Sequence, residues 1–210
     1  MIKKHSQSRI LLARRAWQKS TTGMSLIEVL VTLAVVSLIM VSASNSVLAL
    51  YKTNNTGTRA LTQISSARSA LTALMTDLRS VAYGNGGSYP IVSMSASSLT
   101  FFSNIPNSTG ATRFQYQING TTLSRSQVSA GTPPTYSGVP VSESLVTYIR
   151  SGAGSAALFR YYDRNGIEVT DMNRVTDVAS ILVSIDVLAP GMSTPFILTA
   201  TTTLRNLKTP

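Results

Sequence analysis

Glu28 is the one carboxylate in a long apolar stretch, and its place suggests chemistry more than that of any other residue in this sequence. No charged residue occurs in residues 29–50, and Lys52 is the next charge along the chain. Because a helix of about 20 mostly apolar residues spans a bilayer, this stretch predicts a membrane helix that begins near Glu28. A carboxylate inside such a helix costs roughly 2.5–3.5 kcal/mol on insertion scales, so it is usually paired with a cation or functional.

The side chains needed for enzymatic catalysis are scarce elsewhere. The chain has no cysteine, and its single histidine, His5, precedes Gly23 in a basic N-terminal segment. A Ser-His-Asp triad and a zinc site with histidine or thiolate ligands are therefore excluded beyond Gly23. A catalytic Ser/Lys pair needs a lysine that is desolvated in a pocket. Beyond Gly23 the lysines are Lys52 and Lys208, and neither lies where a pocket would desolvate it. With no Gly-rich phosphate loop either, we expect a protein that is not an enzyme and holds no cofactor.

Residues 163–168, Asp-Arg-Asn-Gly-Ile-Glu, with Asp171 beyond them, are a candidate calcium loop. An EF-hand loop needs oxygen ligands at its first, third and fifth positions, glycine at the sixth and glutamate at the twelfth. Counted from Asp163, the glycine is fourth and the twelfth residue is Arg174, so the pattern fails. The Asn165-Gly166 pair favours a hairpin turn instead. A cation bound by this loop, calcium in particular, is the alternative.

Basic and aromatic residues lie close together in the C-terminal half, a combination that suits single-stranded nucleic acid. They are Arg150, Arg160, Arg164 and Arg174 with Tyr148, Tyr161 and Tyr162. Strands whose aromatic side chains face the core and whose arginines are solvated explain the same pattern. We favour the strands and expect no nucleic-acid partner.

The basic charge is concentrated ahead of Met24. The whole chain has 18 basic and 8 acidic residues, a formal net charge of +10. Six of the basic residues and none of the acidic ones lie in residues 1–23, which leaves a net charge of +4 on residues 24–210. Since lysine and arginine stay on the cytoplasmic side of a membrane helix, residues 1–23 are interpreted as a cytoplasmic leader, and the C-terminal portion is expected outside.

The segment that opens the apolar run, Gly-Met-Ser-Leu-Ile-Glu at residues 23–28, resembles the processing signal of type IV pilins and of type II secretion pseudopilins. The resemblance implies that a prepilin peptidase cuts between Gly23 and Met24 and methylates the new N-terminus. It also implies that Glu28, the fifth mature residue, pairs with the terminal amine of a neighbouring subunit during assembly. Met24 stands where Phe is commonest, and Ser25 stands where Thr is frequent. Many major pilins carry a C-terminal disulfide, so the lack of cysteine points to pseudopilins or minor pilins.

Two other interpretations of the N-terminus stay open. An ordinary secretory signal peptide would be cut after the small-x-small pattern Val41-Ser42-Ala43. Its apolar region would have about 7–15 residues, whereas this run is longer and has an acid at its start. A single-pass surface adhesin or binding protein would keep residues 1–23 as the flank of its anchor.

Beyond the membrane run, apolar residues recur at three- and four-residue steps, which is the spacing of one stripe along a helix. They are Leu61, Ile64, Ala67, Leu71, Leu74, Leu78 and Val81. We interpret the stripe as packing against a β-sheet and expect the helix to stop at the glycines of residues 84–87. Residues 53–58, Thr-Asn-Asn-Thr-Gly-Thr, have low helix propensity, so a continuous helix, a kink and an unwound link all stay possible there.

From Tyr89 onward, short β-type runs alternate with turn residues. The expected strands are residues 98–102, 113–118, 121–125, 145–149, 158–162, 181–187 and 196–204, with a loop at 131–140 that contains the pair Pro133-Pro134. Asn119-Gly120 predicts a two-residue hairpin with a type I′ turn. Because the strands follow the helix without further helices between them, the expected fold class is α+β, a long N-terminal helix packed on an antiparallel β-sheet head.

The expected organisation is a basic leader over residues 1–23, a membrane helix over 24–51, an amphipathic continuation over 52–83 and a β-rich head over 84–210. The head resembles J-type minor pseudopilins and PilW-type minor pilins. The residues in question are Phe114 and Tyr116, Tyr161-Tyr162-Asp163 before the Asn165-Gly166 turn, and the final Leu204-Arg205-Asn206-Leu207. This resemblance implies a minor subunit, anchored in the inner membrane, that joins other subunits to prime or cap a type IV pilus or a type II secretion pseudopilus.

Overall fold

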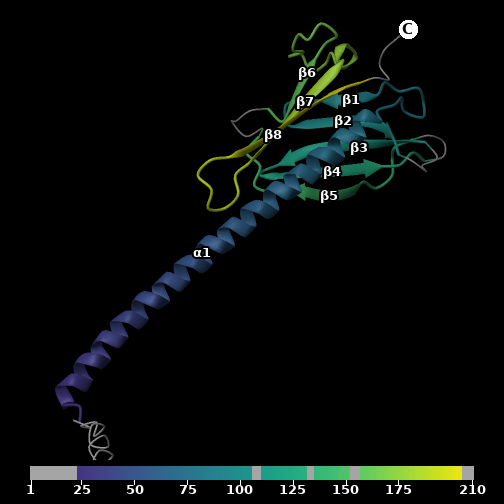
Figure 1. Cartoon of the computed structure of the whole chain (residues 1–210). Coiled ribbons are helices and arrows are strands. Elements are labelled where there is room, and N and C mark those ends of the chain that lie inside the picture. The colour runs from purple at the N-terminus through teal and green to yellow at the C-terminus, as the bar shows by residue number, and fades with distance from the viewer. Residues whose placement is uncertain (1–22, 106–109, 132–134, 152–156, 205–210) are drawn as a thin grey trace, which may run out of the picture. The chain divides into compact units, whose positions relative to one another are not determined.

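A computed structural model of the chain describes residues 23–105, 110–131, 135–151 and 157–204 (Figure 1). The described residues form two compact units, which divide between Tyr51 and Lys52. The second unit confirms the expected fold class, since the later part of one long helix packs there against antiparallel sheets. Most of the expected leader, the prolines at 133 and 134, and the tail from Arg205 onward, with Lys208, lie outside the described residues.

The helix α1 (Leu26–Arg79) is continuous through residues 53–58, the stretch whose propensity left the question open. Threonine hydroxyls in this stretch donate to the carbonyl four residues earlier, Thr56 Oγ1 to Lys52 at 2.9 Å and Thr58 Oγ1 to Asn54 at 3.0 Å. These bonds satisfy the hydroxyls without competing for the helical N–H groups. In the first unit, every described residue is exposed.

The end of α1 contributes the helical side of the core in the second unit. Its buried residues are Ala67, Ala70, Leu74, Met75 and Leu78. The expected stripe is therefore correct in its centre and wrong at its ends. Leu61 is 70% exposed, and the helix ends at Arg79, not at residue 83. Val81 is buried as expected, but it forms a β-bridge with Ser103, because the backbone changes from helical to sheet hydrogen bonds before the glycines are reached.

Eight strands form two antiparallel sheets in the described residues. The five-stranded sheet has the order β1-β2-β3-β4-β5, with β1 (Ile91–Met94), β2 (Ser98–Asn104), β3 (Ala111–Asn119), β4 (Thr122–Val128) and β5 (Val141–Val146). The other sheet has the order β6-β7-β8, with β6 (Phe159–Tyr162), β7 (Ser180–Val187) and β8 (Phe196–Thr203). A short 3-10 helix, η1 (Val175–Asp177), precedes β7. The sequence predicts one sheet and misses β1, whereas the structure has two sheets.

Two local predictions are wrong. The hairpin between β3 and β4 exists, but Gly120 and Thr121 form its turn, and of these two only Gly120 has a positive φ, +61°. A type I′ turn needs positive φ at both central residues, so this is the type II′ pattern, which places glycine first. The strand expected at residues 145–149 is displaced, since β5 ends at Val146 and Tyr148 has φ +61°.

The core of the second unit is built from both sheets and α1. Phe101 stacks between Phe114 and Tyr116 at centroid distances of 5.9 and 6.1 Å. A polar cluster of Asp77, Tyr116 and Arg125, called the tie below, joins the helix to the same sheet. Tyr116 donates its hydroxyl proton to Asp77 Oδ2 at 2.6 Å. Arg125 Nη2 lies 2.8 Å from the same oxygen. This tie positions the end of α1 over β3 and β4.

Candidate functional site

The residues that the sequence singles out lie at the start of α1. Ser25 precedes the helix, and its Oγ accepts a hydrogen bond from the Glu28 N–H at 3.3 Å. The Ser25 carbonyl also accepts from the N–H groups of Glu28 and Val29, at 3.0 and 3.2 Å. A serine at this position with glutamate three residues later is the sequence of a capping box. Ser25 therefore begins the helix, and Glu28 lies in its positively polarised first turn.

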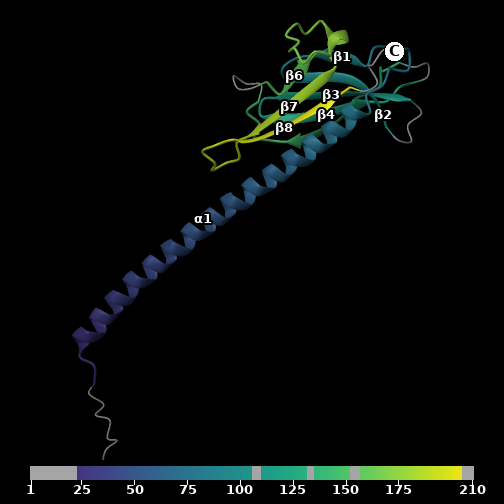
Figure 2. The ribbon, with the colours of Figure 1, turned by 45° about the horizontal axis from the view of Figure 1, so that its top comes forward.

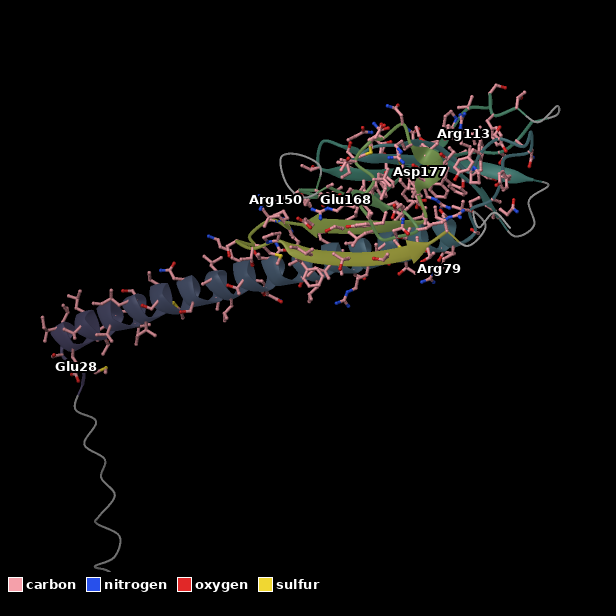
Figure 3. The ribbon with its side chains drawn as sticks, turned by 90° about the horizontal axis from the view of Figure 1, so that it is seen from above. Glu28, Arg79, Arg113, Arg150, Glu168 and Asp177 are labelled. Carbon is pink, nitrogen blue, oxygen red and sulfur yellow. The ribbon has the colours of Figure 1, made fainter. Side chains whose placement is uncertain are left out.

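The Glu28 carboxylate is exposed and is available to a partner. Among the described residues it takes part in no ion pair and no side-chain hydrogen bond. Figure 3 shows the residue at the N-terminal end of α1. An acid in the first turn stabilises a helix by about 0.3–1 kcal/mol. That local effect explains an acid near this position, but it does not explain an acid at the start of a run with no other charge.

Gly23 and Met24 lie ahead of the helix, and both are exposed. A Cβ added at Gly23 would meet no described atom within 4 Å. The fold of the described residues therefore sets no requirement for glycine at this position. A requirement for glycine would have to come from another protein that recognises this segment.

The apolar surface of the first unit is large and continuous along the helix. Leu26 is 81% exposed and Leu38 is 69% exposed, and the other large apolar side chains between them are exposed as well. A soluble surface rarely carries such a patch, which marks a membrane or protein contact. By length and composition, α1 has one stretch near the N-terminus that is apolar enough to cross a membrane.

The candidate calcium loop forms a turn. Asp163 Oδ1 accepts hydrogen bonds from the N–H groups of Asn165 and Ile167, both at 2.8 Å. Gly166 has φ +77°, and Tyr162 and Glu168 close the turn with a β-bridge. The interpretation of Asn165-Gly166 as a turn is confirmed. No group of three or more metal-ligating side chains occurs in the part of the chain that the structure describes.

The candidate nucleic-acid residues do not all lie at the surface. Tyr161 is fully buried, and its hydroxyl donates to the Ser95 carbonyl at 2.8 Å. Burial raises the pKa of the Tyr161 hydroxyl well above its usual range. Arg174 forms an ion pair with Asp177. The expectation that an aromatic residue of this group faces the core is confirmed for Tyr161.

Sequence reasoning missed the tie between Asp77, Tyr116 and Arg125. The Arg125 guanidinium also lies over the Phe114 ring, 4.6 Å from its centroid. Burial first, and then the hydrogen bond to Asp77, raise the pKa of Tyr116 far above its usual value. The one signal in the sequence is an acid within the apolar stripe of the helix. The three side chains bond to one another beside the core, whereas the buried Arg125 Nε has no hydrogen-bond partner among the described residues.

The comparison with known families agrees with the N-terminal geometry. Residues 18–44 match the family described as the prokaryotic N-terminal methylation motif. None of the curated proteins matches the chain. The matched segment covers Gly23, Met24, Glu28 and the first turns of the apolar helix, so the chain is type IV pilin-like or pseudopilin-like at its N-terminus. The motif implies processing by a prepilin peptidase, and proteins of this kind are generally structural subunits without enzymatic activity. The apolar helix is consistent with a prepilin anchored in the inner membrane.

Proposed function

We propose that this chain is a minor pilin or pseudopilin, of the J type or PilW-like, which primes or caps a type IV pilus or a type II secretion pseudopilus. One observation carries the proposal: the methylation motif leads directly into a helix whose apolar side chains are all exposed over residues 26–51. Such a helix needs a bilayer before assembly and neighbouring helices after it. The leader of residues 1–23 stays in the cytoplasm, and the β-rich head lies outside.

In the proposed mechanism, a prepilin peptidase cuts between Gly23 and Met24. Before the cut, the nitrogen of Met24 belongs to an amide and has no charge. After the cut it is an amine, and methylation leaves it basic. Its ammonium form then pairs with the Glu28 carboxylate of a neighbouring subunit. The pair is made where the first turn of α1 already presents that carboxylate without a partner among the described residues.

Helix packing supplies most of the assembly energy in this mechanism, and the charge pair sets the register. A buried ion pair repays its desolvation only when the geometry is close and hydrogen-bonded. Apolar side chains contribute about 25 cal/mol for each Å² removed from water. The exposed leucines, isoleucines and valines of residues 26–50 therefore drive contact with other helices once the subunit leaves the lipid.

Sequencing the N-terminus of the protein from its native membrane tests this function. We expect the mature chain to begin at methylated Met24. A chain that begins at Ser44 would identify an ordinary secretory signal peptide, cut after Ala43. A chain that keeps residues 1–23 would identify a single-pass anchored adhesin. Either result would overturn the proposed function.

A further inference from the structure

The outer edge of β8 is an open row of backbone hydrogen-bonding groups. β8 is the last strand of its sheet, in which β7 lies between it and β6 (Figure 2). The Ser184 N–H donates to Leu158 at 2.9 Å, so even-numbered residues of β7 turn their backbone groups toward β6. The register pairs Ser184 with Thr199 and Ile185 with Leu198. Because backbone direction alternates along a strand, Ile197, Thr199, Thr201 and Thr203 turn their N–H and C=O groups away from β7.

No described residue satisfies these groups. None of the four residues takes part in a backbone or side-chain hydrogen bond outside the sheet, within the part of the chain that the structure describes. Their side chains are exposed as well, Ile197 by 56%. An edge of this kind is a template for another strand, and most proteins block it.

The other three sheet edges are blocked or interrupted. β1 has four residues, and its register shifts between Ile91 and Ser93. β5 pairs with β4 through a second shift and carries Glu143. β6 is short, and Tyr162 at its end bridges to Glu168. β8 pairs regularly over all eight residues and contains no proline and no charged residue. The devices that usually protect an edge are therefore missing from β8.

A cationic groove lies at the end of this edge. It has a volume of about 520 Å³, and it is lined by Arg79 together with residues 201–203 of β8. Figure 3 shows Arg79 at the end of α1, beside the tip of β8. Arg79 forms no ion pair with any acid among the described residues. The groove therefore joins unpaired backbone donors and acceptors to an uncompensated guanidinium.

We infer that the β8 edge binds an extended segment of a different pilin-like subunit, which adds a strand beside residues 199–203 and brings an acidic side chain to Arg79. Backbone hydrogen bonds provide affinity in strand addition, and side-chain contacts provide specificity. A second copy of β8 would bring no acid, because β8 has no charged residue. Only one part of the inference rests on the proposed function, namely that the partner is another pilin-like subunit.

The test is pairwise co-expression with each other host chain that carries the methylation motif, in cells that lack the prepilin peptidase. The full-length precursors are extracted in detergent, and the amount of partner that co-purifies is measured. Thr201→Pro removes one outward N–H and leaves the pairing with β7 intact, since proline is tolerated at the open side of an edge strand. Thr201→Val is the matched control, because it removes the hydroxyl and keeps the N–H. Arg79→Glu reverses the charge in the groove.

We expect one partner to co-purify with the wild type and with Thr201→Val, and at least tenfold less of it with Thr201→Pro and with Arg79→Glu. Replacing the partner's acidic residue by arginine should restore the complex with Arg79→Glu. Hydrogen exchange in residues 196–203 of the wild type should slow when the partner is bound. Unchanged melting temperatures establish that the variants fold. If Thr201→Pro does not fold, Arg79→Glu alone decides the test.

Three results would overturn the inference: no partner with the wild type, equal capture by Thr201→Pro, or capture of a second copy alone. Cleavage plays no part in this experiment because the peptidase is absent. Failure of the proposed function would instead be seen in the N-terminal sequence of the native protein, so the two failures are distinguishable.

Discussion

At the scale of single residues, Gly23 and Glu28 differ in how far the fold of this chain explains the residue type at each position. A substituent at Gly23 meets open space among the described residues, so nothing in the chain itself requires glycine. Glu28 has a partial local explanation, because the first turn of a helix favours an acid. The requirement at Gly23 is therefore expected to come from the peptidase, and the requirement at Glu28 from assembly.

Replacing Gly23 by valine should block processing without affecting the fold. When the prepilin peptidase is co-expressed, we expect a full-length band on a gel for Gly23→Val and a shortened band for the wild type. Met24→Phe is the control, since phenylalanine is the commonest residue at this position in the proteins that the motif resembles, and it should be cut as the wild type is. A shortened band from Gly23→Val would contradict the proposed cleavage site.

Replacing Glu28 by leucine should separate processing from assembly. We expect Glu28→Leu to be cleaved normally and to be absent from sheared fibres, because the terminal ammonium of a neighbour then has no counter-charge. Ser25→Ala is the matched control. It keeps the carboxylate but loses the cap of α1, at a cost of about 0.5–2 kcal/mol. If Ser25→Ala were lost from fibres to the same degree, helix initiation and not charge pairing would explain the phenotype.

At the scale of elements, the tie between α1 and the five-stranded sheet is the most specific contact of the helix. Tyr116→Phe removes a hydrogen bond to an ionised acceptor, which is worth about 1.5–3 kcal/mol of unfolding free energy. We expect a loss of that size in denaturant unfolding of the full chain in detergent. Tyr162→Phe is the control, because the Tyr162 hydroxyl makes no hydrogen bond among the described residues. Equal losses in both variants would show that the tie contributes nothing specific.

The elements that the sequence predicts well are those whose pattern is local. The centre of the α1 stripe and the strands β3, β7 and β8 follow from regular spacing of apolar residues. β1 escapes prediction because the register shift between Ile91 and Ser93 breaks its alternation. β5 is misplaced because its first four residues are exposed and three of them are polar, so they give no apolar signal.

The functional features likewise fall into those that local sequence predicts and those that only the folded chain brings together. The residues around the start of α1 are close together in sequence, so a short motif reveals Gly23, Met24 and Glu28 together. The partners of Asp77 lie on β3 and β4, and only the folded sheet brings them to the helix. The open edge of β8 is also invisible in the sequence, because the lack of a neighbouring strand is a property of the sheet order.

At the scale of the whole molecule, the chain assigns its two tasks to different units. The first unit has no core of its own in the structure, and it needs lipid or other helices to cover it. The second unit buries a core that joins both sheets to the end of α1. Removal of the leader takes six of the 18 basic residues, which would otherwise hold the N-terminus at the cytoplasmic face. In the function we propose, processing is therefore the step that allows the same chain to leave the membrane.

The core of the second unit should make the protein sensitive to alkali. The pKa of Tyr116 and that of Tyr161 are both raised in the fold, chiefly by burial, and these residues lie in different sheets. Above about pH 10, a tyrosine in the unfolded chain loses its proton whereas the folded one keeps it. The folded state then binds more protons, so stability falls as pH rises. It falls by about 1.4 kcal/mol for each pH unit and each tyrosine.

Denaturant unfolding of the full chain in detergent, followed by circular dichroism between pH 9 and pH 12, measures this dependence. The stability of the wild type should be constant below about pH 10 and should then fall, with contributions from Tyr116, from Tyr161 and from Tyr89, whose pKa is also raised, chiefly by burial. Tyr161→Phe should be less stable at neutral pH, because the bond to Ser95 is lost, yet its stability should decline less steeply with pH than that of the wild type. Since both tyrosines unfold with one core, one transition is expected at every pH. A wild type whose stability does not fall in this range would show that water reaches both hydroxyls in the folded protein.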